Sequence, residues 1–200
     1  MHRWIKLQRQ SLLVNIFRIC DFTVGAISLD QKKKLFMRRA NLDDLPALPH
    51  LPKDYELRVA TVHDAKAIAE ILKTAYSPFW PAFRARYILL DAEDVKRTFI
   101  VTFNNKPIAT ASARLVPKLY PGSGYVHWVA VHPDHQGKRL GYVVSLAVLH
   151  FFKEIGCRDA VLETEQSRLP AINLYTKLGF LPEYVYPSQK ELWANVLAKA

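Results

Sequence analysis

The sequence predicts a mixed α/β fold with one main β-sheet, and two observations carry this prediction. Stretches with strand-like alternation and stretches with helical periodicity follow one another in the order β-α-α-β-β-β-α-β-α-β. Half of the 200 residues are hydrophobic and 12% are aromatic, which supplies a core and excludes a wholly disordered chain. A chain of this length suits one domain with an appendage.

The first strand is expected at 55–60, where apolar and polar residues alternate. Asp64 can cap a helix that continues to Ala75, and a second helix follows Pro81. Three aromatic residues near these helices are assigned to the core, with a substrate wall as the alternative: Phe79, Trp80 and Phe83.

The middle of the chain predicts a hairpin followed by a central strand. The segments 98–103 and 107–116 form the hairpin around an Asn104-Asn105-Lys106 turn. After a loop rich in glycine and proline at 117–124, the apolar, β-branched and aromatic run 125–131 suits a buried strand.

The last third predicts two helices that alternate with two strands. The first helix spans 138–155 and ends at Gly156. A strand follows at 160–164, and Pro170 stands in the first turn of the next helix. Leu178-Gly179-Phe180 ends that helix, Gly179 being expected in the left-handed region, and 182–186 leads into the last strand.

The chain divides into a basic extension with a proline-rich linker (1–54), a main folded domain (55–190) and a C-terminal tail (191–200). Net charge is +10, about half of it before Tyr55. Two charge runs, Lys32-Lys33-Lys34 and Arg38-Arg39, are expected to be solvated.

Residues 1–30 are too charged and too short in their apolar run to span a bilayer. A helical arm, a membrane-surface helix and a stretch outside the native coding sequence are the three alternatives for this segment. A chain that begins at Met37 is expected to fold and function. Cys20 and Cys157 form no disulfide framework, which makes a cytoplasmic protein the default.

The stretch Gly124 to Gly141, GYVHWVAVHPDHQGKRLG, organises the rest of the chain. It combines a buried strand, a turn at Pro133 and a loop that leads into a helix. The unpaired N–H groups at a helix start favour an anion, most naturally a phosphate.

This loop resembles motif A of the GNAT superfamily of acetyl-CoA-dependent N-acetyltransferases, written Gln/Arg-x-x-Gly-x-Gly/Ala. Gln136, Gly137, Lys138, Leu140 and Gly141 fit that pattern. Arg139 stands where the middle glycine is usual, and we expect it inside the first helical turn with an ordinary φ. The flanking HWVAVHPDHQG and the later LPAINLYTKLGF strengthen the resemblance, which covers about 55–185.

The resemblance implies a GNAT-type acyltransferase fold. That fold is a single mixed, mainly antiparallel sheet of about six or seven strands, with splayed strands four and five and flanking helices. It also implies acetyl-CoA as acetyl donor. The backbone of strand four would bind the acetyl carbonyl and the pantetheine, and the loop amides the pyrophosphate. The implied donor-binding residues are Val129, Ala130, Val131, Gln136, Gly137, Lys138, Arg139, Leu140 and Gly141.

The same resemblance implies direct attack by an amine in a ternary complex. Tyr175 stands at the position of the family's thiolate acid, and a phenol suits that role because its pKa is close to that of a thiol. Arg168 stands where the family often has an asparagine next to the donor. His127 is the first candidate base and Glu163 the second, with a buried core histidine and a surface acid as the alternatives. No metal is expected, because His132 and His135 lack a third ligand at useful spacing.

The expected partners are acetyl-CoA and an amine that is a small molecule or a peptide; a homodimer is left open. A coenzyme A-binding module without turnover is the first alternative function. A basic nucleic-acid-binding protein is the second, although charge alone motivates it.

Overall fold

The computed structural model of the protein describes residues 34–198. Within them, one seven-stranded sheet has the strand order β2-β3-β4-β5-β6-β1-β7. The strands are β1 (Leu35–Arg39), β2 (Tyr55–Val59), β3 (Val95–Phe103), β4 (Lys106–Arg114), β5 (Ser123–Val131), β6 (Asp159–Thr164) and β7 (Leu181–Glu183). All neighbouring strands are antiparallel except β5 and β6. The predicted single, mixed and mainly antiparallel sheet is therefore confirmed.

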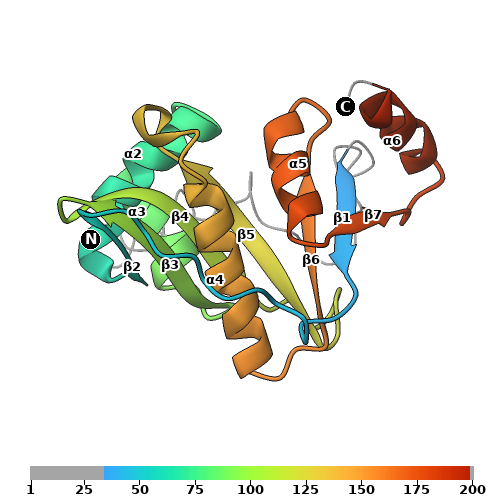
Figure 1. Ribbon diagram of the computed structural model, residues 1–200, viewed down its shortest axis with the longest axis horizontal. Helices are drawn as coiled ribbons and strands as arrows, with labels where there is room; N and C mark the ends of the chain where they lie inside the picture. Colours follow the sequence, from blue (N-terminus) through green and yellow to red (C-terminus); the bar gives the residue numbers. More distant parts are fainter. Residues whose placement is uncertain (1–33, 199–200) are drawn as a thin grey trace, which may run out of the picture. The chain divides into compact units, whose positions relative to one another are not determined.

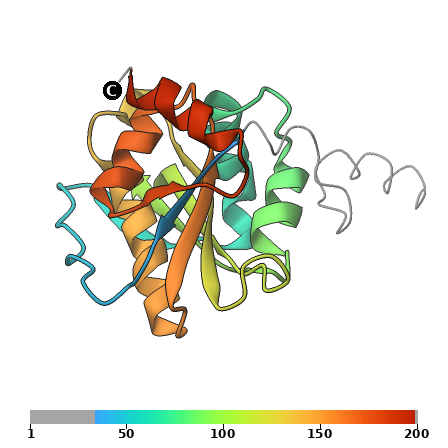
Figure 2. The same ribbon diagram turned by 90° about the vertical axis from the view of Figure 1, so that its right-hand side faces the viewer.

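Helices cover both faces of the sheet. The helical elements are η2 (Val62–Asp64), α2 (Ala65–Ala75), α3 (Ala82–Ala85), η3 (Arg86–Leu90), η4 (Pro133–His135), α4 (Leu140–Glu154), α5 (Leu169–Lys177) and α6 (Gln189–Leu197). Figure 2 shows α4 and α5 on one face and α2 and α3 on the other. Within residues 34–198, no helix is both long and apolar enough to cross a bilayer.

The hairpin of β3 and β4 forms as predicted, because Asn104 and Asn105 both adopt positive φ (48° and 65°) in its turn. The next pairing is irregular. Thr110 lies opposite Ala130 and Ser112 lies opposite His127, so β5 carries one residue more than β4 between these pairs. This residue count defines a β-bulge in the central strand.

β5 and β6 separate from each other over most of their length. They pair only from Ser123 opposite Asp159 to Tyr125 opposite Val161. Figure 1 shows the two strands together at one end and apart at the other. The splayed pair that the resemblance implies is thus present, and the two facing strand edges are left without backbone partners from each other.

β1 differs most from the sequence interpretation, which placed its residues in an extension. Leu35, Phe36 and Met37 are buried, and β1 lies between β6 and β7 in the sheet. The pair Arg38-Arg39 is not a solvated charge run. Arg39 is buried and contacts the Leu178 carbonyl and the Asp44 carboxylate.

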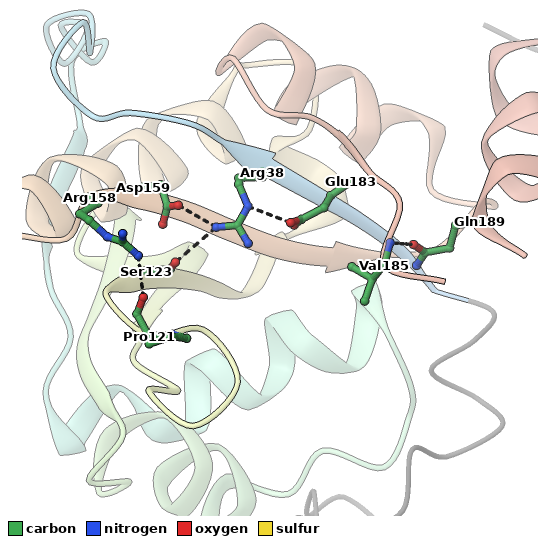
Figure 3. Close-up of polar contacts among 8 residues, drawn as sticks. All are labelled: Arg38, Pro121, Ser123, Arg158, Asp159, Glu183, Val185 and Gln189. Carbon is green, nitrogen blue, oxygen red and sulfur yellow. Dashed lines mark hydrogen bonds and ion pairs between the residues drawn. The ribbon is translucent and has the colours of Figure 1, made fainter. Parts of the chain in front are cut away.

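Arg38 ties the closed end of the splay to β1 (Figure 3). Its Nε donates to Glu183 Oε1 (2.9 Å), and its Nη1 donates to Asp159 Oδ2 (2.7 Å) and Ser123 Oγ (3.3 Å). One guanidinium therefore joins β5, β6, β1 and β7, which fixes where the splay begins.

Two further segments differ from expectation. Trp80 is buried as predicted, but Phe79 and Phe83 are 64% and 56% exposed, so core packing is wrong for these two. The residues expected as a tail form α6, which packs on the domain through buried Trp193. The side-chain amide of Gln189 also bonds the Lys34 carbonyl (2.9 Å), next to β1.

Candidate active site

The open edge of β5 presents backbone groups to the splay. The N–H of His132 donates to the Ile108 carbonyl of the preceding strand (2.8 Å). Because the backbone groups of alternate residues in a strand point to opposite sides, those of Val129 and Val131 point away from β4 and toward β6. Among the described residues, β6 offers them no partner, since its pairing with β5 ends at Tyr125.

The carbonyls of these two residues already have side-chain partners. The Tyr76 hydroxyl donates to the Val129 carbonyl (2.7 Å), and the Gln136 side-chain amide lies 3.5 Å from the Val131 carbonyl. The N–H groups therefore remain for a ligand in the cleft. Ala130 differs, because it pairs with Thr110 of β4 and its buried side chain packs toward α2.

The loop from Gly137 to Gly141 leads into α4 with unpaired amides. The amide of Gln136, which the sequence also assigned to the ligand, differs, because its N–H donates to the Pro133 carbonyl (3.1 Å). Among the described residues, none accepts a backbone hydrogen bond from the N–H groups of residues 137–142, and helical bonding begins with Val143 N–H to Arg139 O (3.1 Å). Gly137 has φ +76°, and a Cβ there would meet no atom within 4 Å. Lys138 and Arg139 are exposed beside these amides. This set fits a phosphorylated ligand such as the pyrophosphate of a coenzyme.

Arg139 corrects one expectation from the sequence. It lies at the N-cap of α4 with φ 58°, in the left-handed region, and α4 begins only at Leu140. Glycine adopts this conformation at no steric cost, which explains why the family pattern has glycine there. Arg139, which replaces that glycine, therefore has a strained backbone conformation. Gly141 has a different reason to be glycine, because a Cβ there would lie 2.9 Å from Leu174 Cδ1.

Tyr175 and Arg168 meet Tyr76 near the splay. Tyr175 is 6% exposed, and burial raises the pKa of its phenol above the ordinary value, with a smaller contribution from Tyr76. The Arg168 guanidinium lies over the Tyr76 ring, 4.1 Å from its centroid. The Tyr175 phenol therefore stays protonated at neutral pH, and its raised pKa makes it a weaker acid than a free tyrosine, further from the pKa of a thiol than the sequence argument assumed.

His127 lies on β5, at the side of the bulge that faces away from α4. Its ring is 5.4 Å from the Trp128 ring and 5.7 Å from the Tyr125 ring. Burial, followed by the charges of Arg114 and Lys34, lowers its pKa well below the usual value. Its buried Nδ1 has no hydrogen-bond partner among the described residues. The imidazole is thus neutral at pH 7, and its Nδ1 is available to a ligand.

Glu163 extends this polar group on β6. Only 5% of its side chain is exposed, with Lys34 Nζ 4.0 Å from one oxygen and the Tyr120 hydroxyl 3.5 Å from the other. Tyr125 stacks on Tyr120 at 5.8 Å and is a further hydrogen-bond partner of Glu163. Burial raises the pKa of the Glu163 carboxyl, and Lys34 opposes that shift. The surface-acid alternative is therefore wrong for this residue.

His132 and His135 stabilise the turn that follows β5. His135 Nδ1 lies 3.1 Å from the Tyr55 hydroxyl, and His132 Nδ1 lies 3.4 Å from the Asp134 N–H. Within residues 34–198, no group of three or more His, Cys, Asp or Glu side chains is arranged to hold a metal ion.

Sequence reasoning missed four side chains of this region: Lys34, Tyr76, Tyr120 and Trp128. Lys34 and Tyr120 lie in segments assigned to a linker and a loop, so no periodicity pointed to them. Trp128 looked like an ordinary strand residue, although its φ of +49° marks the bulge.

The splayed sheet and the loop of unpaired amides before a helix are the two structural features that the resemblance implied. Residues 65–180 match the family model "Acetyltransferase (GNAT) family", and the chain belongs to this family. The resemblance stated from the sequence is thereby confirmed.

The relatives are acetyltransferases by name. The chain is 31% identical over 154 residues to a mycothiol acetyltransferase of Actinosynnema mirum, covering 74% of this chain and 52% of that protein. It is 43% identical over 65 residues to the one of Nocardia farcinica, covering 32% and 22%. The chain thus spans about half, or less, of the length of these curated relatives.

Solved structures share the fold. The ribosomal-protein-S18-alanine N-acetyltransferase of Escherichia coli is 25% identical with a TM-score of 0.53, covering 64% of this chain and 77% of that one. An aminoglycoside N-acetyltransferase solved in complex with CoA has a TM-score of 0.58 at 18% identity, covering 68% and 96%, which supports the fold alone.

Proposed function

We propose that the chain transfers an acetyl group from acetyl-CoA to an amine by direct attack in a ternary complex. The observation that carries the proposal is the splay between β5 and β6, which leaves the β5 edge at Val129 and Val131 unpaired with β6 among the described residues. Two such donors suit a thioester carbonyl that gains negative charge during attack.

The donor would be held along one continuous backbone path. The amides from Gly137 to Gly141 bind the pyrophosphate, with charge added by Lys138 and Arg139. Val129 and Val131 bind the pantetheine and the carbonyl end. Arg168 lies at the same cleft through its contact with Tyr76, which is consistent with a role beside the donor. Ala130 would contribute only the spacing between its two neighbours, because its own backbone pairs with β4.

Tyr175 would protonate the departing thiolate. The phenol carries its proton at neutral pH, and the position of Tyr175 next to Tyr76 brings it to the cleft. Tyr175→Phe keeps the ring and removes only that proton, so turnover should fall by roughly ten- to a thousandfold. The affinity for coenzyme A should change little, because the backbone path is intact.

His127 and Glu163 would discharge the incoming ammonium. Neutral His127 has an unpartnered ring nitrogen, and Glu163 is a buried carboxylate with a raised pKa. Both lie on the sheet face opposite α4, where Tyr120 and Tyr125 form an aromatic wall. An amine acceptor is therefore expected to enter from this face.

The acceptor itself stays an open class of amines. The names of relatives and neighbours differ in the acceptor, since they read mycothiol, ribosomal-protein-S18-alanine and aminoglycoside. No contact in the described residues favours nucleic acid or a module without turnover. A cytoplasmic location and a homodimer stay predictions.

An amine panel with acetyl-CoA, followed by thiol release, tests the function directly. The panel should include small alkyl and aryl amines, amino sugars and short peptides. At least one should give release that depends on both substrates and falls in the Tyr175→Phe variant. Tight coenzyme A binding without release from any amine would instead favour the module without turnover.

A further inference from the structure

Tyr76, from the end of α2, reaches the open edge of β5. Its hydroxyl donates to the Val129 carbonyl at 2.7 Å, on the side of the strand that faces the splay. Val129 would thus have two roles. Its N–H would bind the thioester carbonyl, and its own carbonyl accepts the hydrogen bond from Tyr76. The two groups of one residue lie a few ångströms apart, so the Tyr76 ring lies close to the position of an acyl chain.

The ring of Tyr76 is fixed on two further sides. The Trp128 ring meets it edge-on, with centroids 4.8 Å apart and an interplanar angle of 85°. The Arg168 guanidinium, from the connection between β6 and α5, lies 4.1 Å from its centroid. Trp128 is itself held by Trp80 at 4.6 Å. A ring clamped in this way moves little when a ligand enters.

Tyr76 still has 36% of its surface exposed, whereas Trp80 behind it has 1%. Tyr76 therefore lies at the surface, with Trp80 buried behind Trp128. Because its hydroxyl bonds the Val129 carbonyl at the β5 edge, the residue lies beside the space where the acyl group would lie.

We propose that the Tyr76 ring is a specificity-determining wall that limits the acyl group of the donor to acetyl. The inference rests on the proposed function, since it assumes that an acyl-CoA thioester lies in the splay. It names a residue and a property, acyl-chain length, that the proposed function leaves open. A longer acyl chain would meet the clamped ring and would bind only at the expense of the contacts that hold it.

A simpler role for Tyr76 is to stabilise the bulge of β5 through its hydrogen bond to Val129, and variants distinguish the two roles. The stabilising role requires the hydroxyl. The role as a wall requires the ring. Tyr76→Phe removes the first and keeps the second, whereas Tyr76→Ala removes both. Tyr76→Leu, which retains apolar contact with Trp128, provides a second shortened side chain should the alanine variant fail to fold.

The test is calorimetric binding of CoA, acetyl-CoA, butyryl-CoA and hexanoyl-CoA without acceptor, so that turnover plays no part. Wild type and Tyr76→Phe should bind acetyl-CoA more tightly than butyryl-CoA. In Tyr76→Ala and Tyr76→Leu the affinity ratio should shift toward butyryl-CoA by about tenfold, because each newly buried methylene contributes roughly fourfold. Affinity for CoA itself should stay within about threefold.

Tyr184→Ala is the matched control, because Tyr184 is an exposed tyrosine (53%) that follows β7. It should leave the ratio unchanged. An unchanged ratio in both shortened variants would overturn the wall while leaving the acetyl donor in place. An equal shift in Tyr76→Phe would assign the effect to the hydroxyl and also overturn it. Absence of acyl-CoA binding by the wild type would contradict the proposed function and the inference together.

Discussion

At the residue scale, the backbone strain of the donor loop is concentrated at one residue. Arg139 has φ 58°, a conformation that costs a residue with a Cβ about 1–2 kcal/mol. The loop retains this geometry because α4 begins directly after it, so the unpaired amides stay aligned for a ligand. The motif pattern predicted the loop from the sequence, but it could not predict that the arginine would adopt the dihedral of the glycine it replaces.

The first prediction compares Arg139→Gly with Lys138→Gly. Both variants remove one positive charge, and both make the unfolded chain more flexible, which costs about 0.5–1 kcal/mol. Only Arg139→Gly also relieves a positive φ. It should therefore leave the free energy of unfolding unchanged or raise it by up to about 1 kcal/mol, whereas Lys138→Gly should lower it. Urea titration without ligand measures both, and equal losses would show that Arg139 is unstrained.

The second prediction concerns Glu163. Burial places its pKa above that of the unfolded chain, so the ionised carboxylate costs stability at every pH above the folded pKa. That cost disappears as the pH falls through the folded pKa. Glu163→Gln should accordingly melt at a higher temperature than wild type at pH 7, and the gain should vanish under acid conditions.

The same variant should also lose turnover if Glu163 acts as a base. Stability and activity would then move in opposite directions, which a purely structural ion pair with Lys34 does not predict. Lys34→Met serves as the control, because it leaves the carboxylate buried without its ammonium partner and should lower the melting temperature. A lower melting temperature for Glu163→Gln at pH 7 would count against the assignment.

His127→Ala gives the contrasting signature, and it is the third prediction. Because the imidazole is already neutral at pH 7, its removal should lower the rate most where the acceptor is protonated. Part of the loss should return at higher pH, where the free amine needs no base. The pH dependence of kcat/KM measures this, and a loss that is uniform from pH 6 to 9 would assign His127 to packing.

At the element scale, β1 changes the boundaries of the domain. Leu35 and Met37 have no exposed surface and Phe36 has 3%, although a lysine run precedes them and two arginines follow. The strand is five residues long, and its partners β6 and β7 lie more than a hundred residues away. Local pattern reasoning could not find it, because the evidence for this strand lies in its distant partners.

Several other elements were predictable for the opposite reason. The β3–β4 hairpin, the helix after the donor loop and the glycine ends of α4 and α5 follow from neighbouring residues. The bulge at Trp128 could not be predicted, because positive φ at a tryptophan has no local signal. The contacts of Tyr76 could not be predicted either, since they join α2, β5 and the start of α5.

The fourth prediction tests β1 by truncation, and it reverses the expectation for a chain that begins at Met37. Such a chain lacks Leu35 and Phe36, whose burial contributes about 1.5–3 kcal/mol each. That loss is comparable with the whole stability of a typical domain. We expect a broad or absent thermal transition for this chain and a sharp one for a chain that begins at Lys34. Equal melting of the two would show that the sheet does not need the first half of β1.

At the scale of the whole molecule, ligand binding should couple the loop to the stability of the entire fold. Any ligand that binds only the folded state stabilises it, by about 2.7 kcal/mol at a concentration a hundredfold above Kd. For a domain of this size the melting temperature should then rise by roughly 5–10 °C. The loop lies between β5 and α4, both of which belong to the main core, so the whole domain should melt in one shifted transition.

The fifth prediction assigns that shift to the amides between Gln136 and Gly141. Gly141→Asp places a negative charge among them and should abolish the shift with acetyl-CoA. A side chain at this position also crowds Leu174, whose Cδ1 would lie 2.9 Å from the new Cβ. Gly141→Ala carries the same crowding without the charge, so both variants should melt lower than wild type without ligand. With acetyl-CoA, the alanine variant should recover part of the shift and the aspartate variant none, because only aspartate repels the pyrophosphate. A full shift in Gly141→Asp, measured by differential scanning calorimetry at saturating acetyl-CoA, would place the donor elsewhere on the molecule.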